Sequence, residues 1–267
     1  MNNKNYKIRS DLAIQNKNLK LKNHKKVNSI EVNYYYNNKE NYTNILFKTL
    51  ETKEHMRILS DNLAIEIKKY LKKYQMKKED SCLIVGLGNK DIVSDSLGVL
   101  SANNVIATAY LKKLNISKKY RDTYVYNTGI IKNTGIIPYN NIKALVREIK
   151  PKFIIIIDAL ISGSIEYLNK VIQISDKGIT PGSGVSNYGE EISYKTLKIP
   201  VIVIGVPTAI EASTIIRDVL NIDNDDVPFK EGYDLIVSSK DIDIFINYIS
   251  KVIGEGINIA LNNINSF

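Results

Sequence analysis

Five short hydrophobic runs after residue 80 constrain the fold of this chain more than any other feature. They read CLIVGLGN, KFIIIIDA, VIQISDKG, PVIVIGVP and DLIVSS, and each ends in turn-forming or polar residues. Apolar runs without alternation are typical of strands buried on both faces, which occur in parallel sheets covered by helices. Helical patterns separate them, at about 95–113, 139–150, 208–220 and 240–262. The sequence therefore predicts an α/β fold with a mostly parallel central sheet flanked by helices in three layers.

The first 80 residues follow different patterns. Apolar and polar residues alternate over 30–36 and again over 45–47, with the polar stretch NNKEN between them. Such alternation about a polar turn predicts a β-hairpin. Over residues 52–76, apolar side chains recur every three or four positions among lysines, which predicts an amphipathic helix.

Charge divides the chain in the same place. Residues 1–80 hold 18 Lys/Arg and 9 Asp/Glu, whereas residues 81–267 hold 19 of each, so the net charge of +9 is N-terminal. The lysines are scattered among asparagines and do not surround an aromatic platform, which favours a solvated surface over nucleic-acid binding. We expect one α/β domain over 12–267, with a basic hairpin and helix part at 12–80 and a sheet core at 81–267.

Composition also bears on the compartment. No stretch approaches 18 apolar residues, and the N-terminus lacks a signal-peptide core, so we expect an intracellular protein without a membrane partner. Cys82 is the sole cysteine and lies within a hydrophobic run, which excludes a disulfide framework within the chain.

A first candidate site follows the run that ends in Gly86. Gly88 and Asn89 continue it, and Asp95 comes shortly after. The spacing invites a nucleotide-binding interpretation, but Asp91 interrupts the G-x-G-x-x-G pattern and no Walker lysine follows. We therefore interpret the glycines as a close backbone turn that positions Asp95. The alternative for Asp95 is a helix N-cap.

Two more candidates follow later runs. Asp158 ends the run FIIIID, at the edge of the sheet where loops build sites; its alternative is a structural aspartate that accepts backbone N–H bonds. The run VIQIS leads into a loop rich in small residues, where backbone can approach a ligand closely. We expect this loop to contribute Asp176 as a third acid or a turn residue, and to help bind substrate through Gly182, Ser183 and Gly184.

Two facing aspartates offer an acid and a base together. Like charges a few ångströms apart raise one pKa by roughly 1–3 units, so one carboxyl keeps its proton near neutral pH. The ionised carboxylate can take a proton from water that attacks a peptide carbonyl, while its partner donates to the carbonyl oxygen. A Ser-His-Asp or Cys-His site would need His24 or His55, and both lie in the basic N-terminal part.

Six segments together resemble the germination protease family. They are IRSDLA at 8–13, LIVGLGN at 83–89, SDSLG at 94–98, IIIIDAL at 154–160, QISDKGITPGSGVSN at 173–187 and PVIVIGVPT at 200–208. The longest is the most specific.

The resemblance implies an atypical aspartic endopeptidase that degrades small acid-soluble spore proteins during germination, in the cytoplasm of the forespore and the spore core. It implies that Asp95 and Asp158 are the catalytic pair and that no cofactor or metal is needed. It further implies a homotetrameric zymogen that removes an N-terminal prosegment, here residues 1–11, by autocleavage between Asp11 and Leu12.

The expected fold is also similar to that of hydrogenase maturation peptidases, which bind nickel through acids and a histidine. No histidine follows His55 here, so the sheet core lacks the imidazole that such metals favour. A metallopeptidase of that kind is the alternative, and a catalytically inactive basic binding protein is a second one.

Overall fold

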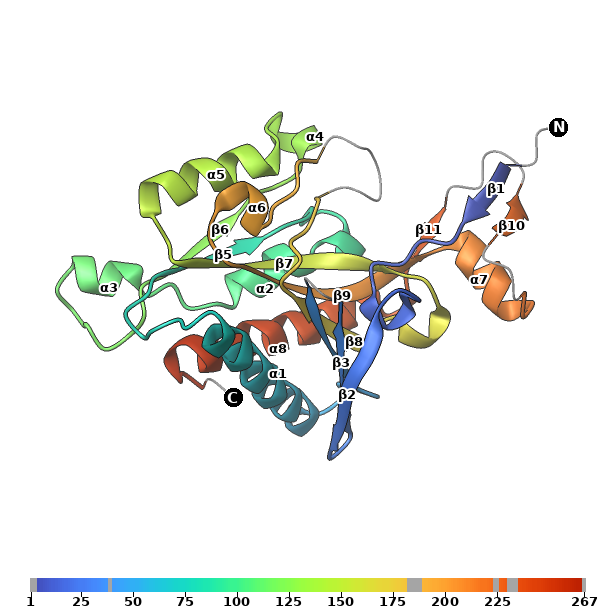
Figure 1. Ribbon diagram of the computed structural model, residues 1–267, viewed down its shortest axis with the longest axis horizontal. Helices are drawn as coiled ribbons and strands as arrows, with labels where there is room; N and C mark the ends of the chain where they lie inside the picture. Colours follow the sequence, from blue (N-terminus) through green and yellow to red (C-terminus); the bar gives the residue numbers. More distant parts are fainter. Residues whose placement is uncertain (1–3, 38–39, 182–188, 223–225, 230–234, 266–267) are drawn as a thin grey trace.

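A single large sheet between two layers of helices organises the molecule (Figure 1). The computed structural model describes residues 4–37, 40–181, 189–222, 226–229 and 235–265. Nine strands form the sheet, in the order β2-β3-β4-β8-β9-β7-β5-β6 with β11 paired to β9, and β1 and β10 form a separate two-stranded ribbon. The predicted α/β fold with three layers is confirmed.

The bounds of the elements are as follows. The strands are β1 (Lys4–Lys7), β2 (Lys20–Val27), β3 (Ile30–Tyr36), β4 (Asn41–Leu46), β5 (Cys82–Gly86), β6 (Thr123–Asn127), β7 (Phe153–Ser162), β8 (Val171–Ser175), β9 (Val201–Glu211), β10 (Asp226–Phe229) and β11 (Ile236–Val237). The α-helices are α1 (Lys53–Lys73), α2 (Leu97–Asn103), α3 (Ala109–Lys113), α4 (Ile131–Thr134), α5 (Pro138–Ile149), α6 (Tyr194–Leu197), α7 (Ala212–Val219) and α8 (Ile242–Asn262). Three 3-10 turns, η1 (Ala13–Gln15), η2 (Val93–Asp95) and η3 (Ile165–Tyr167), complete the chain.

The two faces of the sheet bury separate hydrophobic clusters. Side chains such as Ile84, Ile155 and Ile204 pack with α1 and α8 on one face. Val85 and Ile154 point to the opposite face, where α5 and α6 cover them. Burial on both faces is the physical reason that these strands read as continuous apolar runs.

The sheet is mixed, and its parallel part is smaller than the sequence predicts. Strands β9, β7, β5 and β6 are parallel, whereas β2, β3, β4 and β8 pair antiparallel. A parallel crossover needs about a dozen residues or more. The link from β7 to β8, residues 163–170, is too short for one, so β8 returns antiparallel to β9.

Most predicted elements are present, with differences that have physical causes. The hairpin is β3 and β4, and the amphipathic helix is α1. The run DLIVSS is wrong as a buried strand, because β11 has two residues and both are exposed. The helix expected over 95–113 is split into η2, α2 and α3, and the one over 208–220 begins at Ala212, because β9 continues to Glu211.

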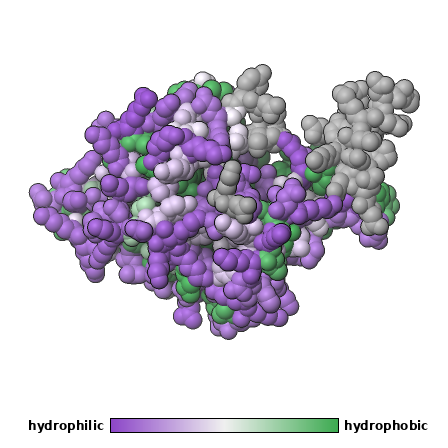
Figure 2. Space-filling model, viewed as in Figure 1, coloured by the Kyte–Doolittle hydropathy of each residue, from purple (hydrophilic) through white to green (hydrophobic). Residues whose placement is uncertain are grey.

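Helix α8 is long and apolar enough, by length and composition alone, to span a membrane. Two thirds of its most apolar window is buried inside the protein, where the helix packs against α1 and α2. That burial is typical of a core helix. Figure 2 shows polar side chains over most of one face of the molecule, with apolar ones in scattered patches.

Candidate active site

Asp95 is held in a tight turn at the end of β5. The backbone N–H of Asn89 donates to its carboxylate Oδ2 at 2.7 Å. Gly88 has a φ of +101°, and a Cβ there would collide with the backbone oxygen of Asp95, so glycine is required on both counts. The residue at the N-cap of α2 is Ser96, not Asp95. The carboxylate of Asp95 is therefore fixed by the glycine turn itself.

Asp158 lies on the neighbouring strand β7, next to the same turn. The N–H of Leu87 donates to the carbonyl of Ile157 at 2.9 Å, which joins the turn to β7. Gly98, at the start of α2, packs so closely on the carbonyls of Leu87 and Ile157 that a side chain would not fit. Backbone contacts thus bring the two predicted aspartates together at one edge of the sheet.

The surroundings of the two carboxyl groups shift their pKa values by different amounts. Burial raises the pKa of Asp158 well above its ordinary value, and the negative charges of Asp95 and Asp11 raise it further, against the backbone N–H of Ala159. Burial also raises the pKa of Asp95, but the N–H of Asn89 opposes that shift by stabilising the charged form. The environment therefore favours a proton on Asp158 and a charge on Asp95.

The segment that contains Asp11 and Leu12 lies beside this pair. The N–H of Asp11 donates to the Ile161 carbonyl at 3.1 Å, and the N–H of Ile161 donates to Asp11 Oδ2 at 2.8 Å. Burial of its carboxyl group raises the pKa of Asp11, although the residue as a whole is exposed. Leu12 is 2% exposed and packs against Leu160 and Val171.

Gln173 is a site residue that the sequence analysis did not single out. Its side chain bridges the backbone on both sides of Leu12: Nε2 donates to the Asp11 carbonyl at 2.9 Å, and Oε1 accepts from the Ala13 N–H at 2.6 Å. The sequence does contain a signal for it: Gln173 is the one strongly polar residue inside the buried run VIQI.

Asp176 does not join the pair. Strand β8 runs antiparallel to β9, so its end points away from the edge that carries Asp158. The buried carboxylate of Asp176 instead accepts from the backbone and side chain of Asn41 and from the Tyr74 hydroxyl, and pairs with Lys73. The prediction of a third acid is wrong, and the residue ties α1 to β4. Gly182, Ser183 and Gly184 lie outside the described residues.

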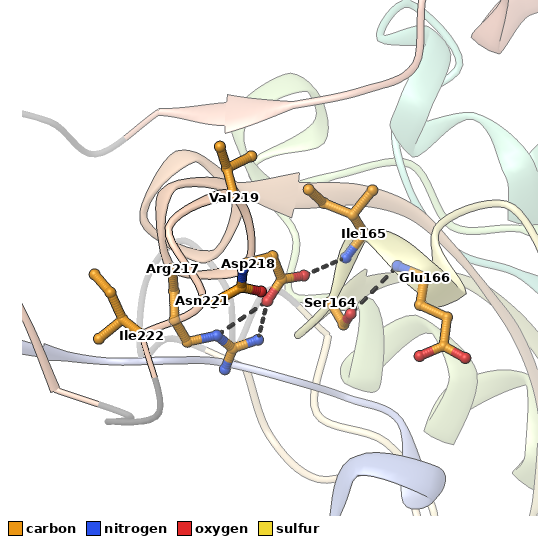
Figure 3. Close-up of a pocket in the computed structure, with 8 residues that line it drawn as sticks. All are labelled: Ser164, Ile165, Glu166, Arg217, Asp218, Val219, Asn221 and Ile222. Carbon is orange, nitrogen blue, oxygen red and sulfur yellow. Dashed lines mark hydrogen bonds and ion pairs between the residues drawn. The ribbon is translucent and has the colours of Figure 1, made fainter.

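A cavity of about 550 Å³ opens between the turn after β7 and helix α7 (Figure 3). Its lining includes Ser164 and Glu166, from the turn after β7, and Arg217 and Asp218, from α7. Figure 3 shows Asp218 bonded to both the Arg217 guanidinium and the N–H of Ile165. The cavity contains neither predicted aspartate, but Arg9 and Ser10 pass close to Gly163 at its border.

The histidines lie away from this edge. His24 is on the exposed strand β2, and His55 is in the first turn of α1 beside a small cavity that Phe47 also lines. Among the residues that the structure describes, no group of three or more His, Cys, Asp or Glu side chains is arranged to hold a metal ion.

Comparison with known proteins gives one family. The sequence profile of the family described as "Germination protease" matches residues 4–223. Among curated proteins, a germination protease from Geobacillus sp. (strain WCH70) is 43% identical over 166 residues, 61% of this chain and 45% of the relative. The chain thus aligns with less than half of that protein.

A second relative aligns almost throughout. The germination protease of Bacillus subtilis (strain 168) is 29% identical over 346 residues, covering 96% of this chain and 94% of the relative. Because the alignment is longer than the 267 residues available, the relative contains residues that have no counterpart here. Among solved structures, a [NiFe] hydrogenase maturation protease HycI from Thermococcus kodakarensis KOD1 is 20% identical over 67% of this chain and 93% of that one, with a TM-score of 0.36.

Proposed function

This chain belongs to the germination protease family, and from that premise we propose that it is an endopeptidase that begins the degradation of small acid-soluble spore proteins during germination. The observation that carries the proposal is the coupled pair of carboxyl groups, Asp95 and Asp158, beside the bound segment of Asp11 and Leu12. The proposed location is the cytoplasm of the forespore and the spore core.

In the proposed reaction the aspartates divide the proton transfers. Ionised Asp95 takes one proton from water as the water oxygen bonds to the carbonyl carbon, and protonated Asp158 donates to the carbonyl oxygen. The carbon–nitrogen bond then breaks as Asp95 gives its proton to the leaving amine and one hydroxyl of the diol returns a proton to Asp158. The new carboxylic acid keeps the water oxygen, and both aspartates regain their starting states. Burial raises the pKa of both carboxyls, but the charges of Asp95 and Asp11 raise that of Asp158 further, while the Asn89 N–H lowers that of Asp95; this difference supports the division, and the titration belongs to the pair.

The proposal includes a zymogen. Cleavage between Asp11 and Leu12 would release residues 1–11 and leave Leu12 as the new N-terminus. Its support is that Asp11 is close enough for its charge to raise the pKa of Asp158, while Leu12 is fixed in an apolar pocket. This position, between an acid whose charge reaches Asp158 and a buried leucine, supports the Asp11–Leu12 bond as the first substrate.

A homotetramer is also part of the proposal, by resemblance to the family. Exposed apolar side chains gather on α7 and around β11, including Val219, Leu220, Leu235 and Ile236, and give subunits a surface to bury. We propose no nucleic-acid partner for the basic N-terminal part.

One experiment tests the proposed activity. The purified full-length chain is incubated with a small acid-soluble spore protein, and the products are followed by mass spectrometry beside an Asp158→Asn variant of verified fold. We expect loss of residues 1–11 and cleavage of the substrate by the wild type alone. An intact substrate with the wild type, or equal cleavage by the variant, would contradict the proposal.

A further inference from the structure

Gln173 lies on the same face of the sheet as Asp158, with strand β9 between their two strands. Strand pairing puts Asp158 opposite Gly205 and Gly205 opposite Gln173, and residues paired in this way point to the same face. The residue between them is a glycine and contributes no side chain. The Gln173 amide and the Asp158 carboxyl therefore point to the same face of the sheet, where the Leu160 side chain lies over Gly205 and packs with Leu12. The Asp11–Leu12 peptide is bound at the Gln173 side of this face.

The contacts of Gln173 fix which way its amide points. The Ala13 N–H can only donate, so the atom that faces it is Oε1, and the Asp11 carbonyl can only accept, so the atom that faces it is Nε2. The carbonyl that receives Nε2–H is the one that belongs to the Asp11–Leu12 bond. Gln173 is 6% exposed; its bond with Ala13 is buried and its bond with Asp11 is half-buried.

We propose that Gln173 is a third catalytic residue, whose Nε2–H polarises the carbonyl oxygen of the peptide bond being cleaved, first in Asp11–Leu12 and then in substrates. This role rests on the proposed function above. A carbonyl oxygen has two lone pairs, so Gln173 can occupy one while Asp158 donates to the other. As water adds, negative charge grows on that oxygen, and a donor already in place stabilises it without reorganisation.

A second observation on the same face supports a surface built for polypeptide. Asn44 on β4 pairs with Gln173 on β8, so its side chain faces the same way. It is fully buried, and neither its Oδ1 nor its Nδ2 has a hydrogen-bond partner among the described residues. An unmatched buried amide costs stability. Asn44 lies on the side of Gln173 away from Asp158, where substrate residues after the cleaved bond would pass. The described part of the N-terminal segment makes no hydrogen bond to the Asn44 side chain.

The test compares variants of the full-length chain. Gln173→Met removes both hydrogen bonds, and Gln173→Glu keeps the acceptor for Ala13 but loses the donor when ionised. Asn258→Asp is the matched control, because Asn258 is also a buried amide that bridges backbone, from Ile106 N–H to the Asn104 carbonyl, outside the site. Mass spectrometry gives the rate at which residues 1–11 are lost, from acidic to neutral pH, with melting temperatures recorded for each protein.

We expect Gln173→Met to slow processing about 100-fold or more, the usual effect of removing one oxyanion donor. Gln173→Glu should be equally slow at neutral pH and recover as the pH falls, because a protonated carboxyl can donate. Asn258→Asp should process at the wild-type rate. Equal rates for the wild type and both Gln173 variants would overturn the role of Gln173 alone. Absence of processing in the wild type would overturn the proposed zymogen, and this inference with it.

A second assay separates polarisation from simple clamping of the N-terminal segment. Wild type and Gln173→Glu, the latter processed at acidic pH, are given a separate peptide of residues 7–16, KIRSDLAIQN, at neutral pH. Polarisation predicts a kcat about 100-fold lower in the variant with little change in KM. An unchanged kcat would mean that Gln173 only holds the N-terminal segment, and failure of the variant to process at acidic pH would also contradict the proposal.

Discussion

Asp95 and Asp158 are the same residue type at the same sheet edge, and their surroundings make them different acids. Asp95 receives a backbone N–H from the glycine turn, which stabilises its charge. Asp158 is more enclosed and faces two negative neighbours, Asp95 and Asp11. Because desolvation and like charges both favour the neutral form, Asp158 holds its proton to higher pH.

The raised pKa of Asp158 predicts a stability change in the variant Asp158→Asn. The folded state binds this proton more tightly than the unfolded chain, so the wild type loses stability as the pH rises from about 4 through the raised pKa. Asparagine has no such dependence. We expect the melting temperature of Asp158→Asn to equal or fall below that of the wild type in acid, and to exceed it increasingly towards neutral pH.

Asp176→Asn provides the contrast for that measurement. Its carboxylate is buried but pairs with Lys73 and accepts from Asn41 and Tyr74. Removing the charge leaves those donors poorly matched, so this variant should melt below the wild type at neutral pH. A melting difference for Asp158→Asn that does not change with pH would contradict a raised pKa.

At this scale the sequence predicted the site where a residue ended a recognisable run. Asp95 follows β5, whereas Asp158 lies inside β7, which continues past the apolar run to Ser162 because it pairs with β9 throughout; the structure brings the two together. Asp176 also follows such a run, but the direction of β8 depends on the short link from β7, which periodicity does not encode. Gln173 was missed because its significance lies in a partner, Asp11, 162 positions away in the chain.

At the scale of elements, close packing of α2 on the sheet determines where the aspartates lie. Gly98 touches the carbonyls of Leu87 and Ile157, one residue before Gly88 and Asp158 respectively. Buried strands, the hairpin and the long helices were predictable because their apolar patterns are strong. The edge strands β2 and β6 were not, since their exposed or half-buried residues include few continuous apolar positions.

The packing of Gly98 predicts a large effect for Gly98→Ala. The added Cβ would overlap backbone oxygens that cannot move without shifting β5, β7 or α2. We expect a loss of about 3 kcal/mol in the free energy of unfolding, measured with urea, and reduced proteolysis by the molecules that remain folded. Gly135→Ala is the control: its φ is +68° but no atom lies within 4 Å, so it should cost about 1 kcal/mol and leave activity unchanged. Equal losses in the two variants would contradict this account.

At the scale of the whole molecule, the N-terminal segment joins parts of the chain that are distant in sequence. Strand β1 pairs with β10, Asp11 bonds to β7, and η1 contacts β3 and β4. The proposed cleavage after Asp11 would therefore release β1 together with Asp11, whose charge raises the pKa of Asp158. The pKa of Asp158 should therefore differ between the chain that carries residues 1–11 and the chain that has lost them.

That connection predicts a change in pH dependence on processing. The charge of Asp11 raises the pKa of Asp158, so its departure with residues 1–11 lowers that pKa, and the new amino group of Leu12 lowers it further while it is protonated. If protonated Asp158 is the acid, activity falls at high pH where its proton is lost. We expect this alkaline limb to lie at lower pH for peptide cleavage by the processed protein than for self-processing by the full chain.

The variant Asp11→Asn tests the same electrostatics without removing any residue. It deletes the negative charge of Asp11 but keeps the chain length and the backbone bond from the N–H of residue 11 to the Ile161 carbonyl. The alkaline limb of its self-processing should therefore lie at lower pH than that of the wild type. This is the direction of shift expected when residues 1–11 are removed. Coincident alkaline limbs for the wild type and Asp11→Asn would mean that the charge of Asp11 does not reach the proton on Asp158, and that the processed protein owes any shift to its new amino group.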